Sequence, residues 1–161
     1  MLEMYYNVFM VKEFLEESNK IENVFDRDSL KQAVRAWEYV TSQKELTPEV
    51  ILKTHGVLMR NQNLRTEEKG CFRRVGVKIG ARYGLEWWLI KEAVKKWCED
   101  TEKSKSKEEI KQNHIAFEII HPFIDGNGRV GRILLNWQRI KNGLPILVIR
   151  NAEKYLYYAW F

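Results

Sequence analysis

Residues 121–132 read HPFIDGNGRVGR, and this stretch joins two segments with helical hydrophobic spacing. Pro122 ends the first helix, and Gly126 and Gly128 allow the backbone to turn sharply before the second helix begins. The first backbone amides of a helix have no partner within it, and the positive end of the helix dipole lies beside them. The stretch therefore predicts an anion site, suited to phosphate, at the junction of two helices.

The side chains of the same stretch suit a nucleotide. Arg129 and Arg132 lie three residues apart, so they share a helix face from which both guanidinium groups can fork onto phosphate oxygens. Asp125 supplies a hard oxygen ligand for Mg²⁺ on a nucleotide, and Asn127 can donate its amide to a phosphate oxygen. His121 is the nearby group that can take a proton from an alcohol near neutral pH.

A structural interpretation of these residues also exists. Residues 125–128 could form an ordinary turn, His121 could be a helix-end histidine bonded to a carbonyl, and the arginines could be solvated. A calcium loop is excluded, because an EF-hand needs another oxygen ligand at the position of Arg129 and a glutamate further on.

The hydrophobic pattern on either side is mostly helical. Apolar residues recur at helical spacing over 30–40 after Asp28 and Ser29, which suit an N-cap. Thr47 and Pro48 predict a helix start, with the helix running to about Met59. Further helices are expected over 85–97, over 110–120, after Gly128 up to a C-cap at Gly143, and from about Asn151, with the polar run 101–109 as a connection. Alternation of Val75, Val77 and Ile79 in a glycine-containing segment predicts a hairpin. The expected fold class is all-α with one small β-hairpin.

Composition favours one packed domain over residues 1–161, because 45% of the chain is hydrophobic and 30% is charged. No apolar run approaches the ~18 residues of a membrane span. Glu3 precedes any basic residue, which does not fit a secretion signal, so a cytoplasmic location is expected and no membrane partner. Cys71 and Cys98 lack the partners of a zinc site or disulfide framework and are expected as reduced, partly buried thiols.

Positive charge gathers in the C-terminal third. The net charge is +5, and from Lys111 onward seven Lys or Arg face three Asp or Glu. Such an excess suits nucleic acid, an anionic surface or a phosphate-bearing small molecule, and composition does not choose among them.

Taken together, residues 121–132 match H-x-F-x-[D/E]-G-N-G-R-x-x-R, the signature of the Fic family, at every fixed position. His114, Gly143, Pro145, Tyr157 and Tyr158 resemble the flanks of that family, so the resemblance covers residues 28–160. It implies a helical Fic-type domain with a small hairpin. It also implies transfer of AMP from ATP to a hydroxyl side chain of a target protein.

The resemblance assigns roles by position. His121 would deprotonate the incoming Ser, Thr or Tyr hydroxyl, and Asp125 would hold Mg²⁺ bridging the α- and β-phosphates. Arg129 and Arg132 would grip the β- and γ-phosphates, and Phe123 would anchor the loop in the core. The full set of implied nucleotide-binding residues is Gly126, Asn127, Gly128, Arg129 and Arg132.

Residues 70–80 resemble the flap of the family, a hairpin edge that aligns an extended segment of the target by main-chain pairing. Arg73, Val77 and Ile79 are the candidate docking residues. A plain structural hairpin with a basic surface is the alternative.

A second, looser resemblance lies near the N-terminus. Residues 18–23 read SNKIEN and fit [S/T]-x-x-x-E-[G/N], with Ser18, Glu22 and Asn23 at the fixed positions. In many Fic proteins this pattern marks an autoinhibitory helix, here expected over 13–25. Its Glu22 would pair with Arg132 and misplace the γ-phosphate. The alternative is a helix end with Glu22 in water and Asn23 as C-cap.

Other functions remain open at this point. The phosphate-binding residues do not read the base, so UTP, GTP or a choline-bearing nucleotide could replace ATP, and removal of AMP could use the same site. A non-enzymatic nucleotide- or nucleic-acid-binding protein is the alternative from another class. It is disfavoured, because His121 and Asp125 would be superfluous in a pure binder. The target protein and any assembly into a homo-oligomer stay undetermined.

Overall fold

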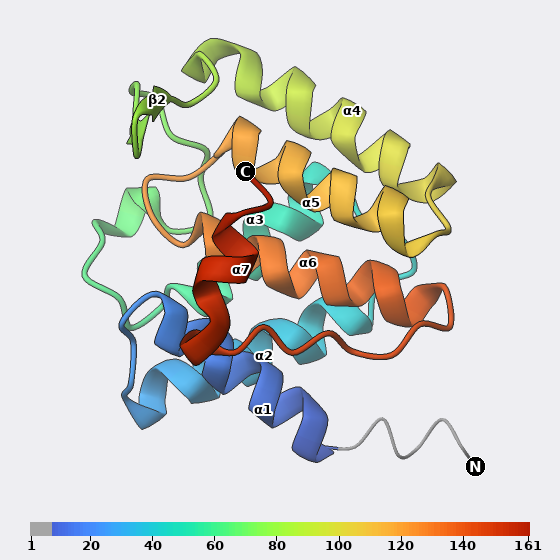
Figure 1. Ribbon diagram of the computed structural model, residues 1–161. Coiled ribbons are helices and arrows are strands. Elements are labelled where there is room, and N and C mark those ends of the chain that lie inside the picture. The colour runs from blue at the N-terminus through green and yellow to red at the C-terminus, as the bar shows by residue number, and fades with distance from the viewer. Residues whose placement is uncertain (1–7) are drawn as a thin grey trace.

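Helix α6 (Asn127–Lys141) runs through the middle of the computed structural model, which describes residues 8–161 (Figure 1). Its residues from Arg129 to Arg139 are all buried, so it is surrounded rather than amphipathic. The helices packed against it are α1 (Val8–Ile21), α2 (Arg27–Thr41), α3 (Pro48–Leu58) and α5 (Lys107–Ile120). The N-terminus of α6 is therefore held from several sides.

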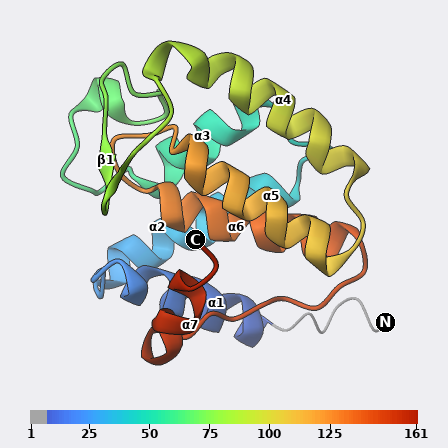
Figure 2. The ribbon, with the colours of Figure 1, turned by 45° about the horizontal axis from the view of Figure 1, so that its top comes forward.

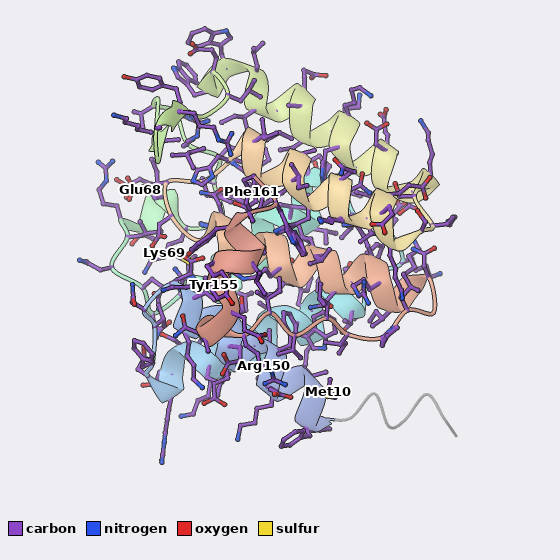
Figure 3. The ribbon with its side chains drawn as sticks, in the orientation of Figure 1. Met10, Glu68, Lys69, Arg150, Tyr155 and Phe161 are labelled. Atoms are coloured by element: carbon purple, nitrogen blue, oxygen red, sulfur yellow. The ribbon has the colours of Figure 1, made fainter. Side chains whose placement is uncertain are left out.

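Two further helices complete the layers. Helix α4 (Ile90–Lys103) packs against α5 and α3, and α7 (Lys154–Tyr158) lies in front of α6 near its N-terminal end (Figure 1). The chain between α6 and α7 returns along α1. In Figure 3 Arg150 lies beside α1, where its guanidinium contacts Glu13, and the backbone amide of Asn151 donates to Glu17 over 2.8 Å.

The hairpin is smaller and later than the predicted 70–80. Strand β1 (Lys78–Ile79) pairs antiparallel with β2 (Arg82–Tyr83), and Gly80 turns between them with φ 57°. Residues 70–77 form no regular strand, although Val75 and Val77 alternate as a strand would. In Figures 1 and 2 the hairpin lies at the same end of the molecule as the loop between α5 and α6.

Several helix boundaries differ from those expected. Helix α2 begins earlier, because Asp26 is its N-cap and accepts from the backbone amide of Ser29 over 2.7 Å. The helix expected over 13–25 ends at Ile21, four residues early, and Asn23 follows with φ 58°.

The polar connection predicted over 101–109 shrinks to three residues. Helix α4 continues to Lys103, and α5 begins at Lys107, where Ser106 and Glu109 form a capping box. A 3₁₀ turn, η3 (Trp87–Leu89), precedes α4, and another, η4 (Asn151–Glu153), precedes α7.

Among residues 8–161, no helix is long and apolar enough for a bilayer crossing. Both cysteines are free; Cys98 is buried, which raises the pKa of its thiol to about 12, whereas Cys71 is exposed rather than partly buried. Residues 1–7 of the predicted single domain, Glu3 included, lie outside the described residues.

Candidate functional site

The loop between α5 and α6 is closed by its own side chains. Gly126 takes φ 85° just before α6, a conformation that favours glycine, and a Cβ there would lie 2.7 Å from the sulfur of Met59. The Asn127 side chain accepts from the backbone amide of Phe123 over 2.8 Å and donates to its carbonyl over 2.9 Å. Asn127 thus fastens the loop, and one of the two donors of its amide is used in doing so.

His121 ends α5 in a left-handed conformation, with φ 49°. Its Nδ1 lies 3.3 Å from the carbonyl of Glu118, and because a carbonyl only accepts, Nδ1 carries the proton and Nε2 is left as an acceptor. Burial lowers the pKa of His121, and the nearby Arg73 and Arg82 lower it further. The ring is therefore neutral at pH 7 and can accept a proton.

The side chain beneath the loop is His55 of α3, which the sequence analysis did not single out. Its ring is fully buried and stacks on Phe123 with centroids 3.8 Å apart. Nε2 lies 2.9 Å from the carbonyl of Asp125, and Nδ1 accepts from the backbone amide of Gly70 over 2.9 Å. Burial lowers the pKa of His55 to about 4. The only sequence signal for His55 is its position on the apolar face of a predicted helix.

Arg132 is 2% exposed and is enclosed by the end of α1. Its Nε donates to the Ser18 hydroxyl over 2.8 Å, and Nη2 donates to the Ser18 carbonyl over 3.0 Å and to Glu22 over 2.8 Å. Its Nη1 lies 3.4 Å from the Tyr157 hydroxyl of α7. The pairing of Glu22 with Arg132 expected from the sequence is therefore present.

Arg129 points elsewhere. Its Nη1 donates to Gln62 over 3.0 Å, and its Nη2 lies 3.5 Å from Asp125 Oδ2. The expectation that Arg129 and Arg132 converge from one helix face is corrected for this state, because each guanidinium has its own partners and both are nearly fully buried.

Asp125 is the exposed carboxylate of the site, with 59% of its side chain accessible. Its Oδ1 accepts from the backbone amide of Gly126 over 2.6 Å, which fixes the side chain at the start of α6. The described residues contain no cluster of three or more His, Cys, Asp or Glu side chains that could hold a metal on its own. One carboxylate is nevertheless a sufficient protein share for Mg²⁺, which is commonly bound by one or two carboxylates and substrate phosphates.

Arg73 has a structural position rather than the expected surface one. It is 2% exposed; its backbone amide donates to the Pro122 carbonyl over 2.9 Å and its Nε to the His121 carbonyl over 2.7 Å. It therefore ties the segment before the hairpin to the loop between α5 and α6, which corrects its assignment as a docking residue. Val77 and Ile79 are partly exposed beside it.

Known proteins resemble this chain over most of its length. The model of the Fic/DOC family matches residues 45–138. A probable protein adenylyltransferase of Aquifex aeolicus is 63% identical over 43 residues, which are 27% of this chain and 13% of that protein. The protein adenylyltransferase Fic of Drosophila grimshawi is 30% identical over 120 residues, which cover 71% of this chain and 24% of that protein. The chain thus spans a quarter or less of these relatives.

Solved structures share the fold at low identity. A Fic domain containing signaling protein from Bacteroides thetaiotaomicron superimposes with a TM-score of 0.79 at 18% identity, covering 98% of this chain and 72% of that one. Fic-1 of C. elegans, residues 134–508, gives a TM-score of 0.77 at 19% identity, covering 99% and 55%. The helical architecture with one hairpin is therefore that of a Fic domain.

Proposed function

The chain belongs to the Fic/DOC family, and from this premise we propose that it is a protein adenylyltransferase that moves AMP from ATP to a Ser, Thr or Tyr hydroxyl of a target protein. The observation that carries the proposal is His121, a neutral imidazole with its Nδ1 bonded to the Glu118 carbonyl and its Nε2 left as an acceptor, beside the N-terminus of α6. Relatives named as adenylyltransferases support it.

The proposed transfer is a single displacement. His121 Nε2 accepts the hydroxyl proton while the hydroxyl oxygen bonds to the α-phosphorus of ATP, and the bond from that phosphorus to the bridging oxygen breaks to release pyrophosphate. The backbone amides around Gly126–Gly128 and the dipole of α6 stabilise the negative charge that develops on the α-phosphate. Arg129 holds the more distal phosphates once its contact with Asp125 loosens.

Asp125 would hold the Mg²⁺ of the nucleotide. Its carboxylate is exposed at the start of α6, and its Oδ1 is oriented by the Gly126 amide. The ion would neutralise phosphate charge and orient the triphosphate.

Glu22 would act as a brake on this reaction. Ser18, Glu22 and Tyr157 together contact all three guanidinium nitrogens of Arg132. The arginine is therefore unavailable to the γ-phosphate, and a triphosphate could bind only with its terminal phosphate displaced. Release of Glu22 would restore the anion site.

The hairpin would align the target. It lies at the end of the molecule where the loop after α5 lies, with Val77 just before β1 and Ile79 within it, and strand edges bind extended peptides through the main chain. Arg73 would act indirectly, by fixing this segment to the His121 carbonyl.

Incorporation of label from α-labelled ATP into lysate proteins tests the proposal, with UTP and GTP as parallel donors. Glu22→Gly is expected to incorporate about ten- to a hundredfold more label than the parent, which is the usual size of such a coupling. Glu16→Gln is the matched control, because Glu16 is a charged residue of α1 that does not contact Arg132. This variant should incorporate as much label as the parent.

His121→Ala in the Glu22→Gly background should lower incorporation by about 10²–10⁴-fold, since it removes the general base. Undiminished labelling by His121→Ala would contradict the role of His121 as the base. Equal labelling by the parent and Glu22→Gly with ATP would contradict the brake.

A further inference from the structure

Glu118 lies in the last turn of α5, three residues before His121, and approaches the His121 ring with both its main chain and its side chain. Its main-chain carbonyl accepts from His121 Nδ1, and its carboxylate Oε2 lies 3.9 Å from the same Nδ1. That second distance is too long for a hydrogen bond but within the range of an ion pair. A charge that appears on the imidazole would therefore face a carboxylate on the side away from Nε2.

One oxygen of the Glu118 carboxylate is buried without a hydrogen-bond partner. The residue is 9% exposed, and its Oε1 is among the buried side-chain atoms that have no hydrogen bond in the described part of the chain. A buried polar atom left unpaired costs about 1–3 kcal/mol, and more when it is charged. The unpaired oxygen thus gives the fold no hydrogen bond, although the charge of Glu118 acts on Arg132.

Space for this carboxylate is left by Gly131 of α6. A Cβ at Gly131 would lie 2.5 Å from Glu118 Oε1, closer than packed atoms approach, and in tight contact, 3.0 Å, with the ring of His114. Glycine in a helix interior costs about 1 kcal/mol relative to alanine. Helix α6 therefore has a residue of low helix propensity where a methyl group would displace the carboxylate.

Three charged groups, from α6, from β2 and from the turn after α1, and two neutral titratable groups surround the carboxyl. Burial raises the pKa of Glu118 to about 7; Arg132 of α6 and Arg82 of β2 oppose that rise, and Glu22 after α1 adds to it. Burial raises the pKa of Tyr157 in α7, and the charge of Glu118 adds to that rise. His114, which lies on α5 with Glu118, is kept neutral because burial and Arg132 lower its pKa to about 3. The carboxyl therefore ionises in the range where His121 would work.

We propose that Glu118 is a positioning residue for the proposed reaction: its carboxylate faces His121 Nδ1 and stabilises the imidazolium that His121 becomes on taking the proton of the target hydroxyl. The inference rests on the proposed function of His121. The proton moves from the hydroxyl to Nε2 and no further, and Glu118 keeps its charge and forms no bond to substrate. It acts through His121 alone, in the way that the carboxylate of a catalytic triad acts through its histidine.

The proposal fixes the pH dependence of the rate. Only the ionised carboxylate stabilises an imidazolium, so kcat should rise as the pH rises through the pKa of Glu118. Because Glu22 raises that pKa, the midpoint in Glu22→Gly should lie below the value of about 7 in the parent.

The test compares Glu118→Gln with its parent, both carrying Glu22→Gly, for kcat and for the KM of Mg-ATP between about pH 6 and pH 9. Glu118→Gln keeps the shape but not the charge. It is expected to lower kcat about tenfold, less than removal of the base, to leave the KM of ATP within about twofold, and to abolish the rise with pH. Gly131→Ala, whose Cβ would displace the carboxylate, should lower kcat similarly, and thermal unfolding of this variant checks that its fold is kept.

A second readout does not require activity. The chain has three histidines, and the NMR signal of the His121 ring is identified as the one lost in His121→Ala. Followed against pH, this signal should show an inflection as Glu118 ionises, and the inflection should be absent in Glu118→Gln. Coincident His121 titration curves, or an unchanged kcat and pH profile in Glu118→Gln, would overturn the proposal. If Glu22→Gly transfers no AMP while the NMR inflection is present, the proposed function fails and the coupling of Glu118 to His121 stands.

Discussion

His55 shows how one buried side chain can hold two parts of the site in register. It bonds the Asp125 carbonyl with one ring nitrogen and the Gly70 amide with the other, and it stacks on Phe123. The loop that precedes α6 and the segment that leads to the hairpin therefore share one support. The bond from the Gly70 amide is lost if the ring is protonated at both nitrogens, because Nδ1 must accept, whereas Nε2–H still donates to the Asp125 carbonyl.

Replacing His55 by phenylalanine should keep the stack on Phe123 but leave the Gly70 amide and the Asp125 carbonyl without their partner. At about 1–3 kcal/mol for each buried unpaired group, the free energy of unfolding should fall by about 3 kcal/mol. Chemical denaturation of His55→Phe and the parent measures the difference. A loss below about 1 kcal/mol would show that the loop does not depend on this support.

Acid should weaken the fold through His55. Its native pKa of about 4 lies below the ordinary 6.5, so the unfolded chain binds this proton first as the pH falls. The stabilisation is complete above about pH 6.5 and lost as the pH falls toward 4, which amounts to about 2 kcal/mol between pH 7 and pH 5. The denaturation curves of His55→Phe should lack this part of the slope. Equal slopes in both proteins would contradict the assignment.

At the scale of elements, α1 combines a core anchor with the contacts to Arg132. Phe14 and Leu15 are 2% and 1% exposed, and Phe14 meets Trp37 of α2 edge to face, with ring centroids 5.4 Å apart. One turn later Ser18 reaches Arg132, and Glu22 follows the last residue of the helix. Docking of α1 on α2 thus sets how firmly Ser18 and Glu22 are held against Arg132.

Phe14→Ala should therefore separate stability from activity. Truncating a buried phenylalanine costs about 3–5 kcal/mol, and weaker docking of α1 should release Arg132 part of the time. We expect a lower melting temperature together with more AMP transfer than the parent shows, up to the level of Glu22→Gly. Loss of stability without any gain in transfer would separate the docking of α1 from the brake.

At the scale of the whole molecule, the sequence predicted the elements better than their contacts. The helical spacing of apolar residues located α2 and α5, because burial on one face leaves a period that a sequence displays. The Thr47–Pro48 start signal located α3, and the motif at residues 18–23 located α1. The hairpin was misplaced, since its two-residue strands are set by the Gly80 turn and by pairing across it, and the alternation of Val75 and Val77 mimicked a strand.

The candidate site was also predicted in part, from its motifs but not from its packing. The pairing of Glu22 with Arg132 was inferred from motifs far apart in the chain, and the structure brings the two together. The support by His55, the burial of Arg73 and the carboxylate of Glu118 could not be predicted, because each depends on which element packs behind the loop and no local spacing encodes that.

Which phosphorus atom of ATP reaches the acceptor is the most direct test of the central claim, that residues 121–132 hold a triphosphate so that His121 directs a hydroxyl at its α-phosphorus. The measurement incubates Glu22→Gly and acceptor with ATP labelled at either the α or the γ position. The account predicts label on the acceptor from α-labelled ATP alone. When the enzyme carries His121→Ala as well as Glu22→Gly, it predicts no label from either nucleotide. Label from γ-labelled ATP, or α-label that survives His121→Ala, would contradict it.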